Sequence, residues 1–190
     1  NSDRYPGGKG WQPGAKQYGY EILRDIFIQL DDSIRLEAEV AYPTDTLTGS
    51  KANGKFPVLV EFTPYKRAGQ ERLRHTYLVE HGYIVAQVHP RGSGSSTGVL
   101  EQFTSRDGLD GVKVVEWASH LDGSNGKVGF FGSSYPAALA LATAAKVGKN
   151  SPLKAVLAAS IGLGAQYRQA WTNNGLPQSL ADDGLREPCR

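Results

Sequence analysis

The stretch GKVGFFGSSYPAALALATAA, residues 126–145, has the pattern of a strand, a tight turn and a helix. Lys127 to Phe131 are mostly apolar, which is typical of a strand buried on both faces. The alanine-rich segment after Pro136 favours a helix. A buried strand that turns sharply into a helix indicates a parallel α/β sheet, in which ligands bind at the carboxyl ends of the strands.

Two serines lie in this turn, and the spacing of the glycine decides between them. A G-x-S-x-G motif in a sharp turn between a strand and a helix is typical of a nucleophile elbow, the turn that presents the catalytic serine of α/β-hydrolases. Gly132 lies two residues before Ser134, whereas Ser133 would need a glycine where the chain has Phe131. We therefore predict Ser134 as the nucleophile. The alternative is a serine-rich helix cap without chemistry.

The residues after Ser134 fit an oxyanion site. Pro136 replaces the last glycine of the motif, and we expect it at the first helical position, where its missing N–H loses no partner. Because the first N–H groups of a helix have no partner within the helix, the N–H of Tyr135 is free to bind a developing oxyanion.

Outward from the turn, strand and helix patterns alternate along the chain. Helical spacing covers residues 70–82 and 107–121, and Asp31-Asp32-Ser33 separates the first two strands as a hairpin turn. Strand patterns cover residues 22–30, 34–43, 56–62, 83–90, 127–131 and 153–160. This order predicts an α/β domain with a mostly parallel sheet over residues 21–160. Residues 1–20 are expected to form an irregular arm, and residues 161–190 a loop or the start of a lid.

Composition excludes several classes of protein. The net charge of +2, without a basic stripe, argues against nucleic-acid binding. The longest apolar run, residues 137–145, is too short to span a bilayer. The four histidines and single cysteine lack metal-ligand spacing, and no phosphate-binding loop is present, so we expect neither metal nor cofactor. The compartment stays open, with secretion favoured over the cytoplasm, and in an exported protein the odd Cys189 would suggest a bond to another chain.

Several segments resemble one family of hydrolases. Asn125 to Tyr135 are similar to the nucleophile segment N-G-x-V-G-x-x-G-x-S-Y-x-G of the CocE/NonD hydrolases, with Ala137 at the final glycine. This family includes cocaine esterase, X-prolyl dipeptidyl aminopeptidase and α-amino acid ester hydrolase. The other similar segments are residues 23–43, 58–67, 89–98 and 107–119. Within them, His89 stands where the family usually has an aspartate.

The resemblance implies an α/β-hydrolase fold, incomplete in this chain, and a serine hydrolase that acts on a small acyl ester, amide or peptide. It also implies that the hydroxyl of Tyr65 completes the oxyanion hole with the Tyr135 N–H. A tyrosine hydroxyl, with an unperturbed pKa near ~10, is a neutral donor at pH 7. The alternative for Tyr65 is a buried tyrosine bonded to the backbone.

The sequence does not supply an evident base for Ser134. In α/β-hydrolases the order along the chain is Ser, then Asp or Glu, then His, yet all four histidines precede Ser134. We expect the acid and the histidine to come from a second polypeptide or a C-terminal segment, with Arg190 a cut end and Cys189 a tether between the pieces. His89 is the local rival as base. The alternative is a non-catalytic, hydrolase-like binding subunit.

Overall fold

The computed structural model describes residues 14–30, 33–65, 73 and 75–161. The chain divides into two units, residues 1–159 and 160–190, and every strand and helix described below lies in the first. Most of the predicted arm, the hairpin turn at Asp31-Asp32, and almost all of the predicted loop or lid at 161–190, including Cys189, lie outside the described residues.

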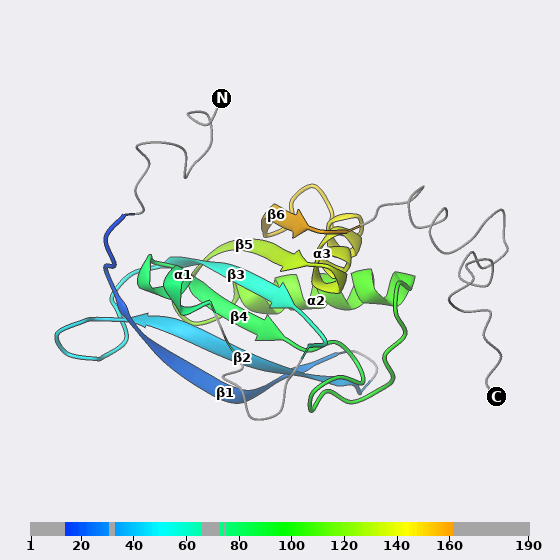
Figure 1. Cartoon of the computed structure of the whole chain (residues 1–190), viewed down its shortest axis with the longest axis horizontal. Helices are drawn as coiled ribbons and strands as arrows, with labels where there is room; N and C mark the ends of the chain where they lie inside the picture. The colour runs from blue at the N-terminus through cyan, green and yellow to red at the C-terminus, as the bar shows by residue number, and fades with distance from the viewer. Residues whose placement is uncertain (1–13, 31–32, 66–72, 74, 162–190) are drawn as a thin grey trace, which may run out of the picture. The chain divides into compact units, whose positions relative to one another are not determined.

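The described strands form one mixed sheet in the order β1-β2-β4-β3-β5-β6 (Figure 1). The elements along the chain are β1 (Gly19–Gln29), β2 (Arg35–Thr44), β3 (Phe56–Phe62), α1 (Thr76–Glu80), β4 (Ile84–Val88), α2 (Ser105–Ser119), β5 (Ser124–Ser133), α3 (Tyr135–Ala144) and β6 (Leu153–Ala159). β1 and β2 are antiparallel, as are β2 and β4. The remaining pairs, β4-β3, β3-β5 and β5-β6, are parallel. The predicted hairpin followed by a parallel sheet is therefore confirmed.

Two of the boundaries that differ from the prediction concern the expected arm and the first expected helix. β1 begins at Gly19, inside the segment expected to be an irregular arm. Of the helix expected over residues 70–82, the described part is helical only over Thr76–Glu80. It ends where expected, because Gly82 has a φ of +87° and its N–H donates to the carbonyl of Val79 at 3.0 Å, an arrangement that glycine adopts without strain.

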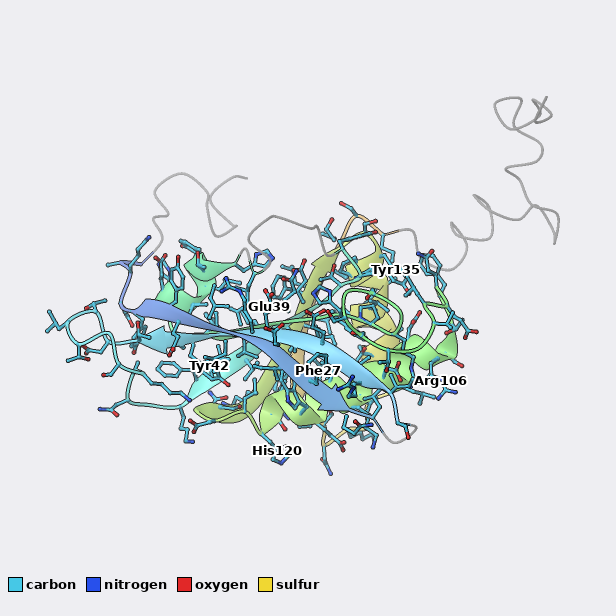
Figure 2. The ribbon with its side chains drawn as sticks, turned by 90° about the horizontal axis from the view of Figure 1, so that it is seen from below. Phe27, Glu39, Tyr42, Arg106, His120 and Tyr135 are labelled. Carbon is cyan, nitrogen blue, oxygen red and sulfur yellow. The ribbon has the colours of Figure 1, made fainter. Side chains whose placement is uncertain are left out.

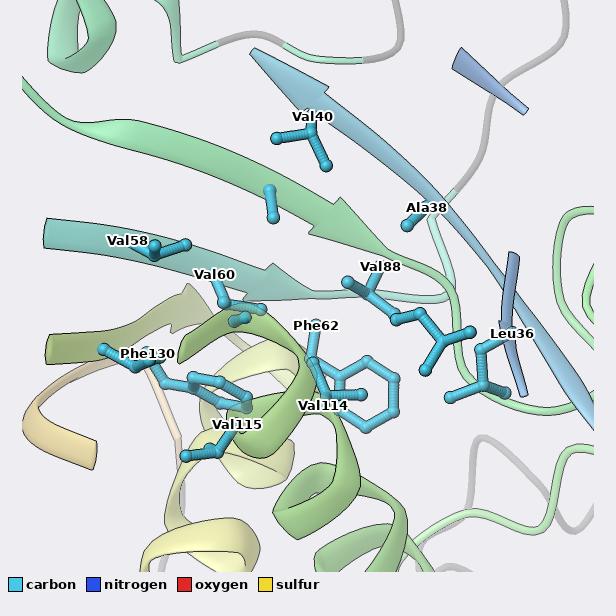
Figure 3. Close-up of a cluster of buried hydrophobic side chains, with 14 of the residues drawn as sticks. Leu36, Ala38, Val40, Val58, Val60, Phe62, Val88, Val114, Val115 and Phe130 are labelled. Carbon is cyan, nitrogen blue, oxygen red and sulfur yellow. The ribbon is translucent and has the colours of Figure 1, made fainter. Parts of the chain in front are cut away.

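The main core lies between the sheet and helices α2 and α3. Figure 3 shows Val114 and Val115 of α2 directed at the apolar side chains of the central strands. Those strand residues include Val58, Val60, Phe62, Val88 and Phe130, each at most 2% exposed. A smaller cluster on the other face joins Ala41 and Val85 to Val79 of α1. Both faces of the central strands are thus covered, which explains their continuous apolar sequences.

The buried face of α2 includes Val115 and Ala118 but not Leu109. Leu109 is 50% exposed, whereas Gly108 and Gly111 are buried. A Cβ atom added to Gly108 would lie 2.6 Å from the carbonyl oxygen of Ala142 in α3. The two helices therefore approach so closely that only glycine fits, a contact that an apolar-periodicity argument does not detect.

β2 also buries charge. Glu37 and Glu39, on the face opposite to Leu36 and Val40, are 0% and 1% exposed. Glu37 organises the turn after β4, since its carboxylate accepts a hydrogen bond from the N–H of Ser95 at 2.5 Å. Apolar and charged residues alternate over residues 34–43, which predicts a strand with two different faces. In the structure the face that carries Glu37 and Glu39 is buried as well.

Candidate active site

Three predicted site residues follow the carboxyl ends of neighbouring parallel strands. Tyr65 comes three residues after β3, His89 directly follows β4, and Ser134 directly follows β5. Because β4, β3 and β5 are adjacent and parallel, their ends meet at one edge of the sheet (Figure 1). This edge is where open α/β sheets bind their ligands.

Ser134 occupies a strained turn between β5 and α3. Its backbone has φ +65° and ψ −127°, and it is exposed to solvent. Its N–H donates to the carbonyl of Ala159, at the end of β6, at 3.0 Å. Positive φ at a non-glycine residue costs on the order of 1–3 kcal/mol and persists only where the surroundings impose it. Ser133, by contrast, is the last residue of the strand.

Gly132 makes this turn tight. A Cβ atom there would lie 2.5 Å from Cβ of Pro136 and 2.7 Å from its carbonyl carbon. Pro136 is the second residue of α3, one position later than predicted, because the helix begins at Tyr135. At that position the missing N–H still has no helical partner, so proline does not weaken the helix.

The N–H of Tyr135 is available for a ligand. It is the first residue of α3, and among the described residues no acceptor for its N–H is found. Helix N-termini carry partial positive charge, and their free N–H groups bind anions. The amide therefore has the position and polarity of an oxyanion donor.

The side chain of Tyr135 is buried among polar and aromatic groups at the start of α2. Figure 2 labels Tyr135 within this region. Its hydroxyl donates to Oδ2 of Asp107 at 3.1 Å, and its ring meets that of Phe103 edge to face, 5.0 Å between centroids. Burial, followed by the charge of Asp107, raises the pKa of the Tyr135 hydroxyl. Burial also raises the pKa of Asp107.

Asp107 was not identified as a site residue from the sequence. The sequence does carry a signal for its local role, because Thr104-Ser105-Arg106-Asp107 is a capping box at a helix start. The N–H of Thr104 donates to Oδ2 of Asp107 at 3.2 Å. The contact with Tyr135 joins residues 28 positions apart, and no local pattern predicts it.

Tyr65 lies at the same edge of the sheet and is accessible. It is 57% exposed, so the alternative of a buried tyrosine is wrong. Its N–H donates to Oγ1 of Thr63 at 3.2 Å. Tyr65 also contributes, after burial and Asp107, to the raised pKa of the Tyr135 hydroxyl.

Three of the four histidines illustrate how different their environments are. His89 is fully buried, and its Nδ1 donates to the carbonyl of Thr63 at 2.8 Å. His120 caps the far end of α2, well separated from Tyr135 in Figure 2. His75 contacts the ring of Phe131, with 4.8 Å between centroids. Among the described residues, no group of three His, Cys, Asp or Glu side chains could hold a metal ion.

Arg91, in the turn after β4, fixes that turn to α2. Its Nε and Nη2 donate to the two carboxylate oxygens of Asp110 at 2.5 and 2.8 Å. A cavity of about 260 Å³ lies beside this pair, with Arg106 and Asp107 in its lining. No helix in the part of the chain that the structure describes has the length and apolar character to cross a membrane.

Comparison with known proteins places this geometry in a family. The model of the X-Pro dipeptidyl-peptidase (S15) family matches residues 32–185. A proposed serine esterase of Mycobacterium bovis is 27% identical over 120 residues, 62% of this chain and 19% of that protein. A CocE/NonD family hydrolase from Staphylococcus aureus superposes with a TM-score of 0.59 at 28% identity, covering 71% of this chain and 26% of that one.

A second similar structure is an α-amino acid ester hydrolase, with a TM-score of 0.58 at 22% identity over 78% of this chain and 26% of that one. These neighbours confirm the predicted α/β-hydrolase fold and the resemblance to the CocE/NonD hydrolases. The chain spans about a fifth of the length of the curated relatives that it matches.

Proposed function

The chain belongs to the X-Pro dipeptidyl-peptidase (S15) family, and from this premise we propose that Ser134 is the nucleophile of a serine hydrolase. The substrates are acyl esters, amides or peptides. The observation that carries the proposal is the backbone of Ser134, held at φ +65° in a turn between a buried strand and a helix. Strain of this kind concentrates at functional sites.

In the proposed reaction, Oγ of Ser134 adds to the carbonyl carbon of the substrate while its proton passes to a base. The carbonyl oxygen becomes an oxyanion, to which the Tyr135 N–H and the Tyr65 hydroxyl donate hydrogen bonds. The tetrahedral species then expels the alcohol or amine, which takes the proton back from the base. Water, activated by the same base, hydrolyses the acyl-enzyme and restores Ser134.

The base and the acid that orients it come, in this proposal, from outside these 190 residues, either from a second chain or from a further segment. Two observations support this. No histidine follows Ser134 in the sequence, although the order in α/β-hydrolases places the histidine last. His89, the local rival, is fully buried, whereas Ser134 is exposed to solvent, so we disfavour it.

The second candidate function is a non-catalytic binding subunit. Such a protein would keep the sheet and its ligand-binding edge but would not need a strained serine. Position 134 could then relax to a helix cap with an extended backbone, as at an ordinary N-cap. The positive φ at Ser134 therefore favours the hydrolase.

Active-site labelling separates the two functions. The full-length protein is treated with a fluorophosphonate, and the adduct is mapped by peptide mass spectrometry. We expect phosphonylation of Ser134, abolished in Ser134→Ala and retained in the matched control Ser133→Ala. An adduct on Ser133, or none in a preparation that hydrolyses esters, would refute the assignment.

A further inference from the structure

The amide proposed to bind the oxyanion belongs to a residue whose side chain is anchored elsewhere. Tyr135 is only 5% exposed. Its hydroxyl donates to Asp107 at 3.1 Å and its ring packs against Phe103 at 5.0 Å. A side chain fixed at both its ring and its hydroxyl leaves its own backbone little freedom, so this anchor also restrains the Tyr135 N–H.

Asp107 connects the beginnings of two helices. It is the third residue of α2, it is 7% exposed, and its Oδ2 accepts from the N–H of Thr104 as well as from the Tyr135 hydroxyl. The close contact at Gly108, where α2 approaches Ala142, keeps the two helices in fixed proximity. The carboxylate is thus a single point that ties the first residue of α3 to the frame of α2.

A capping box alone does not require this arrangement. An exposed aspartate would cap α2 equally well, and burying an ionised carboxylate costs free energy unless hydrogen bonds compensate it. The buried carboxylate of Asp107 also accepts a hydrogen bond from Tyr135, the residue after Ser134. Its position therefore serves more than the capping of α2.

We propose that Asp107 is a positioning residue for the oxyanion hole: through its hydrogen bond to the Tyr135 hydroxyl it holds the Tyr135 N–H where the oxyanion forms. This inference rests on the proposed hydrolase function of Ser134. The reason for its effect on rate is geometric, since a misplacement of about 1 Å at a reacting centre can cost on the order of 10²-fold in rate.

Two variants remove the bond from its two ends. Tyr135→Phe deletes the hydroxyl and leaves the capping box intact, whereas Asp107→Ala deletes both. In the full-length protein, assayed with a p-nitrophenyl ester, we expect kcat to fall roughly ten- to a hundredfold in each single variant, with KM unchanged. The double variant should have the kcat of Asp107→Ala, because the bond can be lost only once.

Stability should behave differently from rate. Asp107→Ala removes the cap of α2 and so lowers stability whether or not residue 135 carries a hydroxyl. If the role of Asp107 were purely structural, Asp107→Ala would lower the thermal midpoint, but it would not share a loss of kcat with Tyr135→Phe. Thr143→Val is the matched control, since it removes another buried hydroxyl of α3, whose one partner among the described residues is the carbonyl of Leu139. Its kcat should equal that of the parent.

Failure of the proposed role of Asp107 can be distinguished from failure of the proposed hydrolase function. If the parent is phosphonylated at Ser134 and Tyr135→Phe retains the parental kcat, the role of Asp107 is overturned and the hydrolase stands. If an active parent is not labelled at Ser134, both are overturned. Should Asp107→Ala not fold, Asp107→Asn takes its place in the cycle, and additive losses of kcat with Tyr135→Phe would equally overturn the role.

Discussion

Gly132→Ala tests whether the tightness of the elbow matters for both folding and chemistry. The added methyl group would lie 2.5 Å from Cβ of Pro136. Carbon atoms in contact are normally about 3.5–4.0 Å apart, so β5 and the start of α3 must separate by roughly 1 Å. Ser134 and Tyr135 lie between the two clashing residues and must move with them.

We expect two measurable consequences of this displacement. Overpacking of a well-packed site typically costs about 1–3 kcal/mol, which urea unfolding of the full-length protein would measure. A shift of about 1 Å in the proposed nucleophile and the proposed oxyanion amide should lower kcat by on the order of 10²-fold, which p-nitrophenyl ester hydrolysis would measure. The loss of rate should be evident at urea concentrations at which the variant is still folded.

Gly148→Ala is the matched control. No heavy atom lies within 4 Å of a Cβ placed at Gly148, and its φ is not in the left-handed region. Its unfolding free energy should therefore stay within about 0.5 kcal/mol of the parent, as for most surface substitutions. Gly132→Ala with parental stability and parental kcat would refute the reasoning, because the elbow would then tolerate a side chain that the structure leaves no room for.

Further predictions concern the oxyanion hole, the helix contact and pH. Tyr65→Phe should lower kcat by about 10²-fold at constant unfolding free energy, because Tyr65 is 57% exposed; an unchanged kcat would contradict its role. Gly108→Val should cost about 1–3 kcal/mol in urea unfolding, because its Cβ would lie 2.6 Å from the Ala142 carbonyl oxygen; full stability would contradict the close helix contact. Burial raises the pKa of Asp107, so its contribution to stability is fully present below its unfolded pKa of about 3.9 and declines as pH rises through the folded value. As pH rises from acid to neutral, the unfolding free energy of Asp107→Asn should therefore increase relative to that of the parent. A decrease relative to the parent would contradict the assigned sign.

The elbow was predictable from sequence because its constraints are local. Gly132 two residues before Ser134, between an apolar strand and an alanine-rich helix, predicts the turn that the structure has at Ser134. The order of strand and helix patterns likewise predicts the hairpin followed by a parallel sheet, and the structure confirms it. The spacing of apolar residues and the local composition determine where turns, strands and helices form, since each of these depends on residues within a few positions of one another.

Only the tertiary structure decided which sides of these elements are buried and which distant residues meet. Leu109 is exposed and the glycines of α2 are buried, because α3 packs against that side. Asp107 meets the Tyr135 hydroxyl across two helix starts. The physical reason is that amphipathic periods and turn motifs act along the chain, whereas close helix contacts, burial of charge and the anchoring of a side chain depend on how elements pack in space.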